Sequence, residues 1–566
     1  MPLQFLRLDD SGWEELKEVV QGKSQSRIGH NLINQWKTAG AQFAVIDHEY
    51  IDRDFTEMFA SFYSRTFKRH GKLCKRAFIF SCDFDNDIVE LTEPGQLVEI
   101  LENKSSKHLI SIVTLRPVPE APINSISSLA DFENDNFRTA NLVKSNLEKH
   151  LIGANVSISA LEMTQQDSRV GSCAQASIWT VARHFKNRHG GRWIAIPEIT
   201  QLATSRAGFD LSQSLPLGSD FLPVGDMVHT LANLGREPYG YSVESLGDGS
   251  YGWRSINPTE VINRYLDSGI PLILGINFPN AAVGHAIVAS GRVRRKTPLN
   301  SPANRRTTAE FYSHVLVNDD QMGPNMFMRC SSVDESGPSG HIYNINISGV
   351  SHEINIEQYL QYIIVPLPSK VFFTAEKAEN ISAALLNDYC SSVAATIKAT
   401  EEVNDVTKER SRKFVSDTQS GEIIFRTYLT YGWKYKKRAL KNELPSSVKV
   451  IIRDLELPKY VWVTEIGTFE SLSSKDPYAR KIFAHSVIDA TAKNTADEAA
   501  LLFHAPGYCL NHQHDRKNEL PLLTQTRALL NDEKSYFPKR RGDEGFEKNS
   551  GKTEAQAATT PTRPRQ

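Results

Sequence analysis

The stretch Met163–Phe185, MTQQDSRVGSCAQASIWTVARHF, places a cysteine at the start of an apolar helical pattern. Ser172 has the side chain of an N-cap residue, and Gln175 three positions later completes a capping box. Cys173 is therefore expected in the first turn of a buried helix, where unpaired amides and the positive end of the dipole favour a thiolate. The alternative is a small buried residue without chemistry, a common role for cysteine.

A histidine opens an apolar strand pattern farther along the chain, in Ala281–Gly291, AAVGHAIVASG. His285 follows Gly284, and a glycine at a strand start lets another group approach closely. At the end of a strand, the imidazole ring of His285 could face the start of a helix and act there as a base. The alternative is a histidine whose ring is hydrogen-bonded at a strand end and has no catalytic role.

An acidic pair ends a third segment, His314–Pro324, HVLVNDDQMGP. Asp319 directly follows the strand pattern, and Asn318 and Asp320 remain alternatives. A carboxylate here can accept the Nδ1–H of the imidazole, which leaves Nε2 to take the thiol proton. Turn formation competes with this interpretation, because Asn and Asp before Gly-Pro commonly start turns.

Taken together, these segments resemble the papain-fold cysteine peptidases, in particular their bacterial, bacteriocin-processing-like branch. The resemblance covers residues 150–370 and rests on GSCAQAS, GHAIVASG and VLVNDDQMGP. It implies a helix carrying Cys173 that packs on an antiparallel sheet carrying His285 and Asp319, with a cleft between them.

The resemblance also implies a glutamine upstream of the nucleophile, whose amide joins the cysteine N–H in an oxyanion hole. Two candidates are present, Gln165 and Gln166, and Gln166 is the closer fit. Both lie farther from Cys173 than the family's usual spacing, which leaves the role open.

The length of 566 residues is too great for one hydrophobic core, so several domains are expected. We expect an N-terminal α/β domain of unknown role over 1–136, the papain-like α+β domain over 137–370, a C-terminal α+β domain with a leading long helix over 371–535, and a disordered tail over 536–566. In the central part a helix comes first and strands follow, which is typical of α+β proteins.

Local patterns assign several elements outside the central domain. Residues 51–67 are expected to form an amphipathic helix, and 372–402 a long helix. In the C-terminal region EIIFRTYLTYGW, SVKVIIRDLEL and YVWVTEIGTF favour strands, and ADEAALLFHA favours a helix.

Composition narrows the classes of partner. The chain has 65 Lys and Arg residues and 66 Asp and Glu residues. Its net charge is therefore too small to produce an overall electrostatic field that would attract nucleic acid or an anionic membrane. The six cysteines are scattered without a CxxC pair, which indicates reduced thiols in a cytoplasmic protein. We find no signal peptide and no apolar run long enough to span a bilayer, so a membrane partner is not expected.

Two further clusters contain side chains of functional types. Residues 433–438, WKYKKR, interleave aromatic and basic side chains as nucleic-acid surfaces do, although an ordinary packed face is the simpler interpretation. Cys509, His512 and His514 have the donor types for zinc but lack a fourth ligand, so no metal site is expected.

The sequence therefore predicts a cysteine hydrolase, a peptidase that acts on a peptide or isopeptide bond of a polypeptide substrate. The triad would be Cys173, His285 and Asp319, with Gln166 in the oxyanion hole and a thioester intermediate, and without cofactor or metal. The alternatives are a transglutaminase or acyltransferase with the same triad, and an inert papain-fold scaffold that binds a polypeptide.

Overall fold

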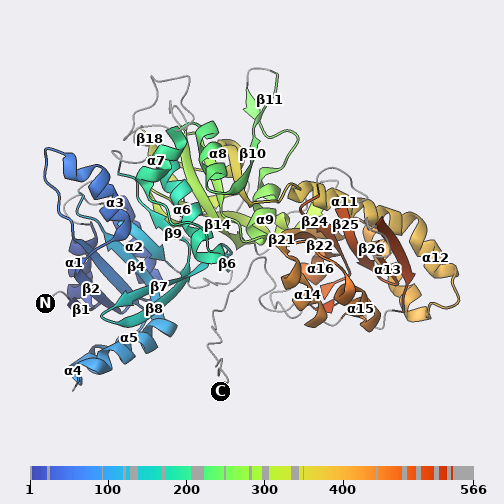
Figure 1. The fold of residues 1–566 in the computed structure, drawn as a ribbon, viewed down its shortest axis with the longest axis horizontal. Helices are drawn as coiled ribbons and strands as arrows, with labels where there is room; N and C mark the ends of the chain where they lie inside the picture. The colour runs from blue at the N-terminus through green and yellow to red at the C-terminus, as the bar shows by residue number, and fades with distance from the viewer. Residues whose placement is uncertain are drawn as a thin grey trace, which may run out of the picture.

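Three large sheets with their helices follow one another along most of the chain (Figure 1). The computed structural model describes residues 3–21, 26–91, 93–118, 123–127, 138–167, 172–204, 222–247, 250–278, 284–295, 305–332, 343–347, 350–441, 444–473, 481–492, 499–515, 522–531 and 537–538. The N-terminal sheet lies at one end, the sheet that carries the candidate site in the middle, and the C-terminal sheet at the other end.

The N-terminal sheet has six strands in the order β1-β2-β3-β4-β5-β9. Their bounds are β1 Leu3–Arg7, β2 Phe43–Tyr50, β3 Cys74–Phe80, β4 Leu109–Leu115, β5 Ile123–Ser127 and β9 Glu162–Thr164. Side chains alternate between its faces: Ala44 and Ile46 pack with α1 (Asp10–Gln21) and α2 (Arg27–Thr38), whereas Phe43 and Val45 pack with α5 (Pro94–His108) and the hairpin β7–β8 (Ser145–Leu151, Ala154–Ala160). Because β9 joins this sheet, its strands extend beyond the sequence boundary at residue 136.

The central sheet is antiparallel, in the order β10-β20-β13-β14-β16-β17, and β6 pairs with β14 in addition. The bounds are β6 Arg138–Asn141, β10 Arg236–Ser242, β13 Leu272–Ile276, β14 His285–Arg294, β16 Tyr312–Asp319, β17 Gly323–Arg329 and β20 Leu360–Pro368. Helices α6 (Cys173–His189), α7 (Ile196–Thr204) and α8 (Val224–Asn233) precede most of these strands. Mixed helices and antiparallel sheets are compatible with the expected α+β class.

Helix α6 begins as its sequence predicts. The capping box between Ser172 and Gln175 is present, and Gly190 ends the helix with a left-handed φ of 69°. Ile178 and Trp179 are fully buried, and the Ser177 hydroxyl donates to the Ala286 carbonyl of β14 at 3.0 Å. The first turn of α6 is thereby fixed beside the start of β14.

The C-terminal sheet has seven strands in the order β15-β21-β22-β24-β25-β26-β27. The bounds are β15 Arg306–Thr307, β21 Ile423–Tyr431, β22 Tyr460–Thr468, β24 Ala484–Asp489, β25 Ala500–Ala505, β26 Tyr508–Asp515 and β27 Leu522–Leu529. Its helices include α11 (Ala375–Asp388), α12 (Ala394–Ala399), α13 (Asp405–Gln419), α14 (Gly432–Lys441) and α15 (Ser446–Asp454). A short π-helix over Tyr389–Val393 joins α11 to α12, so the expected long helix is present with one distortion.

Two local assignments in this region are wrong. SVKVIIRDLEL forms helix α15, whose Val448 and Ile452 are buried one turn apart. ALLFHA forms strand β25, because this run is buried on both faces of the sheet. Short apolar runs carry no decisive periodicity, and tertiary burial decides between helix and strand.

The N-terminal region contacts α6 directly. In α3 (Arg53–Ser61) the Asp54 carboxylate accepts hydrogen bonds from Trp179 Nε1 at 3.1 Å and from Arg183 Nη2 at 2.6 Å. Burial, opposed by Arg183, raises the pKa of Asp54 to about 6. Phe55 and Met58 of α3 belong to the same buried cluster as Trp179. The helix predicted for residues 51–67 is thus shorter than expected: α3 ends at Ser61, a 3-10 turn follows over Tyr63–Arg65, and the helical part supports α6.

A buried ion-pair network links the central domain to the C-terminal one. Arg264 of α9 (Pro258–Asp267) donates to both carboxylate oxygens of Glu379 on α11, at 2.7 and 3.0 Å. The Thr427 hydroxyl of β21 also donates to Glu379, at 2.9 Å. Asp267 bridges Arg292 and Arg426 at 2.7 and 3.2 Å. Arg292, on β14, is therefore a buried structural residue.

Among the described residues, no helix combines the length and apolar character needed to cross a bilayer.

Candidate active site

Cys173 occupies the first position of α6 and is partly exposed to solvent. Tyr362 of β20 lies beside it: burial, together with the nearby Cys173 thiol, raises the pKa of this phenol to about 12. Gly275 on the neighbouring strand makes room for that ring, because an added Cβ would meet Tyr362 ring atoms at 2.0 Å. The thiol therefore lies beside a tightly packed aromatic ring.

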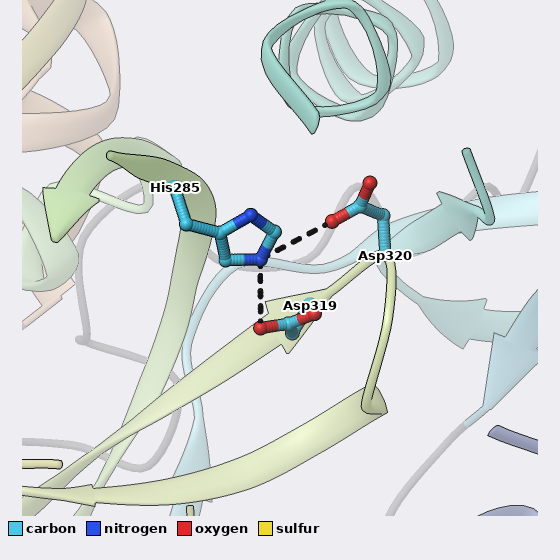
Figure 2. A group of neighbouring side chains, drawn as sticks. All are labelled: His285, Asp319 and Asp320. Carbon is cyan, nitrogen blue, oxygen red and sulfur yellow. Dashed lines mark hydrogen bonds and ion pairs between the residues drawn. The ribbon is translucent and has the colours of Figure 1, made fainter. Parts of the chain in front are cut away.

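His285 lies between the thiol and two carboxylates. Its side chain is hydrogen-bonded to Cys173, and its Nε2 is 3.1 Å from Asp319 Oδ2 and 3.4 Å from Asp320 Oδ1 (Figure 2). Phe278 packs against the ring with a centroid separation of 5.7 Å.

The two ring nitrogens of His285 have the reverse of the roles that the sequence predicts. Nε2, not Nδ1, faces Asp319, and Nδ1 points away from that carboxylate (Figure 2). The sequence assignment of nitrogens is therefore wrong. Nδ1 is the nitrogen left for Cys173, since sequence spacing carries no information on how a ring is turned about its χ angles.

Opposing effects act on the imidazole. Burial lowers the pKa of His285, but the Asp319 carboxylate, the hydrogen bonds to Asp319 and Cys173, and the Asp320 carboxylate outweigh it and hold the pKa well above its usual value. This environment therefore favours the protonated ring, and an imidazolium is the form that can pair with a thiolate.

Asp319 is held rigidly at the end of β16. Its Oδ1 accepts from the amides of Gln321 and Met322 at 2.6 and 3.0 Å, and its Oδ2 accepts from Tyr343 Oη and His285. Burial raises the pKa of Asp319, but His285 and the hydrogen bonds lower it below the usual value. Oδ1 of Asp319 therefore accepts the hydrogen bonds of the turn, and Oδ2 accepts the hydrogen bond that orients the imidazole.

The other two acidic-pair candidates have different surroundings. Asn318 Oδ1 accepts from the Asn325 amide at 3.0 Å, which is a turn contact. Asp320 is buried, and neither of its carboxylate oxygens accepts a hydrogen bond from another described side chain or amide. Burial is the main cause that raises the pKa of Asp320 to about 7, with Asp319 adding to it and His285 opposing it.

Asp320→Asn should change how stability depends on pH. The folded protein keeps the Asp320 proton up to about pH 7, whereas an ordinary aspartate releases it near ~4. Between these values the folded state holds more protons than the unfolded one, so wild-type stability falls as pH rises. We expect the stability of the variant relative to wild type to rise by more than about 1 kcal/mol from pH 5 to pH 8, measured by urea unfolding. A difference that stays constant over this range would contradict the prediction.

The oxyanion-hole candidates are only partly placed. Gln165 Oε1 accepts from the Ile123 amide at 3.4 Å, so its side chain faces the N-terminal sheet. Gln166 is half-buried after β9, and residues 168–171 between it and α6 lie outside the described residues. Gln175 is fully buried, and its Nε2 has no hydrogen-bond partner in the described part of the chain. The sequence assigns the Gln175 side chain to the capping box, so this donor, two residues from Cys173, has no sequence signal of its own.

Donor atoms of His285, Asp319 and Asp320 all lie within 4.8 Å of one another, a group that could hold a metal ion. Nitrogen and carboxylate oxygens suit zinc. Asp319, however, already accepts four hydrogen bonds, so an ion would have to displace the His285 contact.

Cys509 and His512 are three residues apart on β26, hence on opposite faces of the strand, and the side chain of His514 lies outside the described residues.

The sequence reasoning missed Tyr343 and Tyr362. Tyr343 lies 24 residues after Asp319 and reaches it only through the tertiary fold. No motif or period links these tyrosines to the three segments, so no sequence signal identifies them.

No protein-family model matches the chain. Curated proteins likewise give no match.

Proposed function

We propose that the chain is a cysteine hydrolase with a papain-like core, and that it acts as a peptidase on a polypeptide substrate. The observation that carries the proposal is the position of His285, whose ring contacts the thiol of Cys173 and the carboxylate of Asp319. Nucleophile, base and orienting acid in hydrogen-bond reach are the signature of nucleophilic catalysis.

The topology supports the proposal. Strands β14 and β16 are antiparallel neighbours, with Val288 opposite Asn318, so the start of one lies beside the end of the other. His285 and Asp319 therefore meet although 34 residues separate them. Helix α6 packs on β14 and presents Cys173 to the same place.

The residues suggest a sequence of steps. His285 Nδ1 takes the thiol proton, and the Cys173 thiolate attacks the carbonyl carbon of the substrate. The N–H of Cys173 at the start of α6 and the Gln166 amide would stabilise the oxyanion. His285 then protonates the departing amine, which leaves a thioester on Cys173. Finally His285 removes a proton from water, which attacks the thioester and releases the acid and the thiol.

The experiment is the rate of Cys173 alkylation by iodoacetamide from pH 4 to 9. An ordinary thiol with a pKa of about 8.5 is ~0.3 % thiolate at pH 6 and reacts slowly there. A thiolate–imidazolium pair predicts a wild-type rate at pH 6 at least about tenfold above that of His285→Ala, with the label located by peptide mass.

His30→Ala is the matched control, because His30 is an exposed histidine on α2 that contacts Asn34. This variant should keep the wild-type profile. A wild-type rate that rises only near pH 8.5 and does not change in His285→Ala would overturn the proposal. In that case the fold would be an inert scaffold.

A further inference from the structure

Basic side chains from four places meet at the end of α6 opposite Cys173. Arg188 and His189 come from the last turn of α6, Arg236 from the start of β10, Lys434 from the first turn of α14, and Lys459 from the residue before β22. We call these five residues the basic junction. By the helical rise it lies about 24 Å from Cys173, so it is separate from the candidate active site.

A cavity of about 290 Å³ opens beside the basic junction. Its lining includes Phe185, Gly235 and Arg236. The Arg236 guanidinium lies 4.1 Å from the centroid of the Phe185 ring, which holds this cation at the cavity wall. The volume is at the lower end of the range for small-ligand pockets.

Aromatic rings continue from the cavity to the surface. His189 Nδ1 is 2.9 Å from Tyr431 Oη, and Tyr431 stacks on Trp433 with centroids 6.2 Å apart and planes 23° apart. Lys434 Nζ lies 5.4 and 5.5 Å from the centroids of these two rings. Trp433 is 58 % exposed, so much of a large planar ring is open to solvent beside the cations.

Four cations of the basic junction lie around the His189 ring. Burial lowers the pKa of His189 to about 3, with Arg188, Arg236, Lys434 and Lys459 all adding to the effect. Burial, and then Arg188, lowers the pKa of Lys434 to about 8. Within the described part of the chain, Arg236, Lys434 and Lys459 form no ion pair with a carboxylate.

A simpler cause explains only part of this arrangement. Cations in the last turn of a helix offset the negative end of its dipole, which accounts for Arg188. It does not account for Arg236, Lys434 and Lys459, which come from other elements. The N-terminus of α14, whose first turn has no acidic residue, adds the positive end of a second dipole at the same place.

We propose that the basic junction binds the phosphate groups of a nucleotide, with the base stacked on Trp433. Cations and helix amides suit phosphate, and an exposed indole beside them suits a planar base. The nucleotide is free or part of a single strand, since both offer the same chemistry. This site goes beyond the hydrolase function and does not depend on it.

The test is equilibrium dialysis of radiolabelled ATP against the full chain at 50 mM salt, with a ten-nucleotide single-stranded RNA in a parallel arm. We expect saturable binding at micromolar to low millimolar ATP. Lys434→Ala and Arg236→Ala should each weaken it at least tenfold. Trp433→Ala should weaken ATP binding but leave competition by inorganic pyrophosphate unchanged, because only the base uses the indole.

Lys437→Ala is the matched control, an exposed lysine on the same helix, and should change binding less than twofold. Tighter binding of RNA than of ATP, with the same dependence on Lys434 and Arg236, would assign the nucleotide to a single strand. Absence of binding of both probes at 1 mM, or equal losses in Lys437→Ala and Lys434→Ala, would overturn the proposal. Circular dichroism of each variant separates these outcomes from misfolding, and unchanged alkylation of Cys173 separates them from failure of the hydrolase proposal.

Discussion

Acylation of Cys173 by an activated ester such as p-nitrophenyl acetate is expected to slow by about 10²–10⁴-fold in His285→Ala, the usual contribution of a positioned general base. The ester needs no protein substrate, because its reactive carbonyl and good leaving group require only the nucleophile and its base. His285 holds the only histidine nitrogen that contacts the Cys173 thiol within the described residues, so no neighbour is placed to replace it.

The measurement is stoichiometric release of p-nitrophenol together with the mass of the acetylated peptide that contains Cys173. Cys173→Ala should remove the burst altogether, whereas His30→Ala should leave it intact. Asp319→Asn should slow acylation strongly as well, because the amides of Gln321 and Met322 hold the side-chain oxygen and leave the NH2 group to face Nε2, which favours the wrong tautomer of His285. Equal burst rates in wild type and His285→Ala would mean that His285 does not act as a base.

The second large effect concerns stability. Glu379→Ala is expected to lower the free energy of unfolding by about 3–5 kcal/mol, the usual result of removing one partner of a buried ion pair. Glu379 is 1 % exposed and receives two hydrogen bonds from Arg264 and one from Thr427. Without it Arg264 keeps Glu260 at 2.9 Å but loses its fully buried counter-ion.

Urea unfolding of Glu379→Ala and Glu379→Gln measures this effect. The Gln variant should lose less, because its side chain still fills the space and accepts hydrogen bonds. Glu409→Ala is the control: Glu409 pairs with Arg412 on the surface of α13, and its loss should change stability by less than about 0.5 kcal/mol. Equal costs for Glu379→Ala and Glu409→Ala would show that the network contributes nothing.

Much of the candidate site could be predicted from local sequence. The capping box that starts α6, the apolar strand after His285 and the turn after Asp319 are short-range signals, and each is present in the structure. What lies beyond them depends on contacts distant in sequence. The choice of Nε2 over Nδ1 follows from how the sheet turns the ring, and Tyr343 reaches Asp319 only after the chain has folded.

The same distinction explains the errors in the fold. Residues of α15 and β25 carry apolar runs that suit either state, and burial against the C-terminal sheet decides between them. The boundary expected at 136 rests on a polar connector, and after the hairpin β7–β8 the strand β9 pairs with β5. Strand pairing between segments far apart in sequence leaves no trace in local composition.

The contact between α3 and α6 also bears on whether the chemistry can be moved to another protein. Arg183 and Trp179, on the helix that bears Cys173, take their carboxylate partner from Asp54, more than a hundred residues earlier. A fragment cut at residue 137 would carry the proposed triad but would expose Trp179 and leave a buried guanidinium without that partner. The proposed catalytic centre is therefore not a self-contained module: a recombinant protein that received only the segment around it would contain its residues but not the contact that positions them.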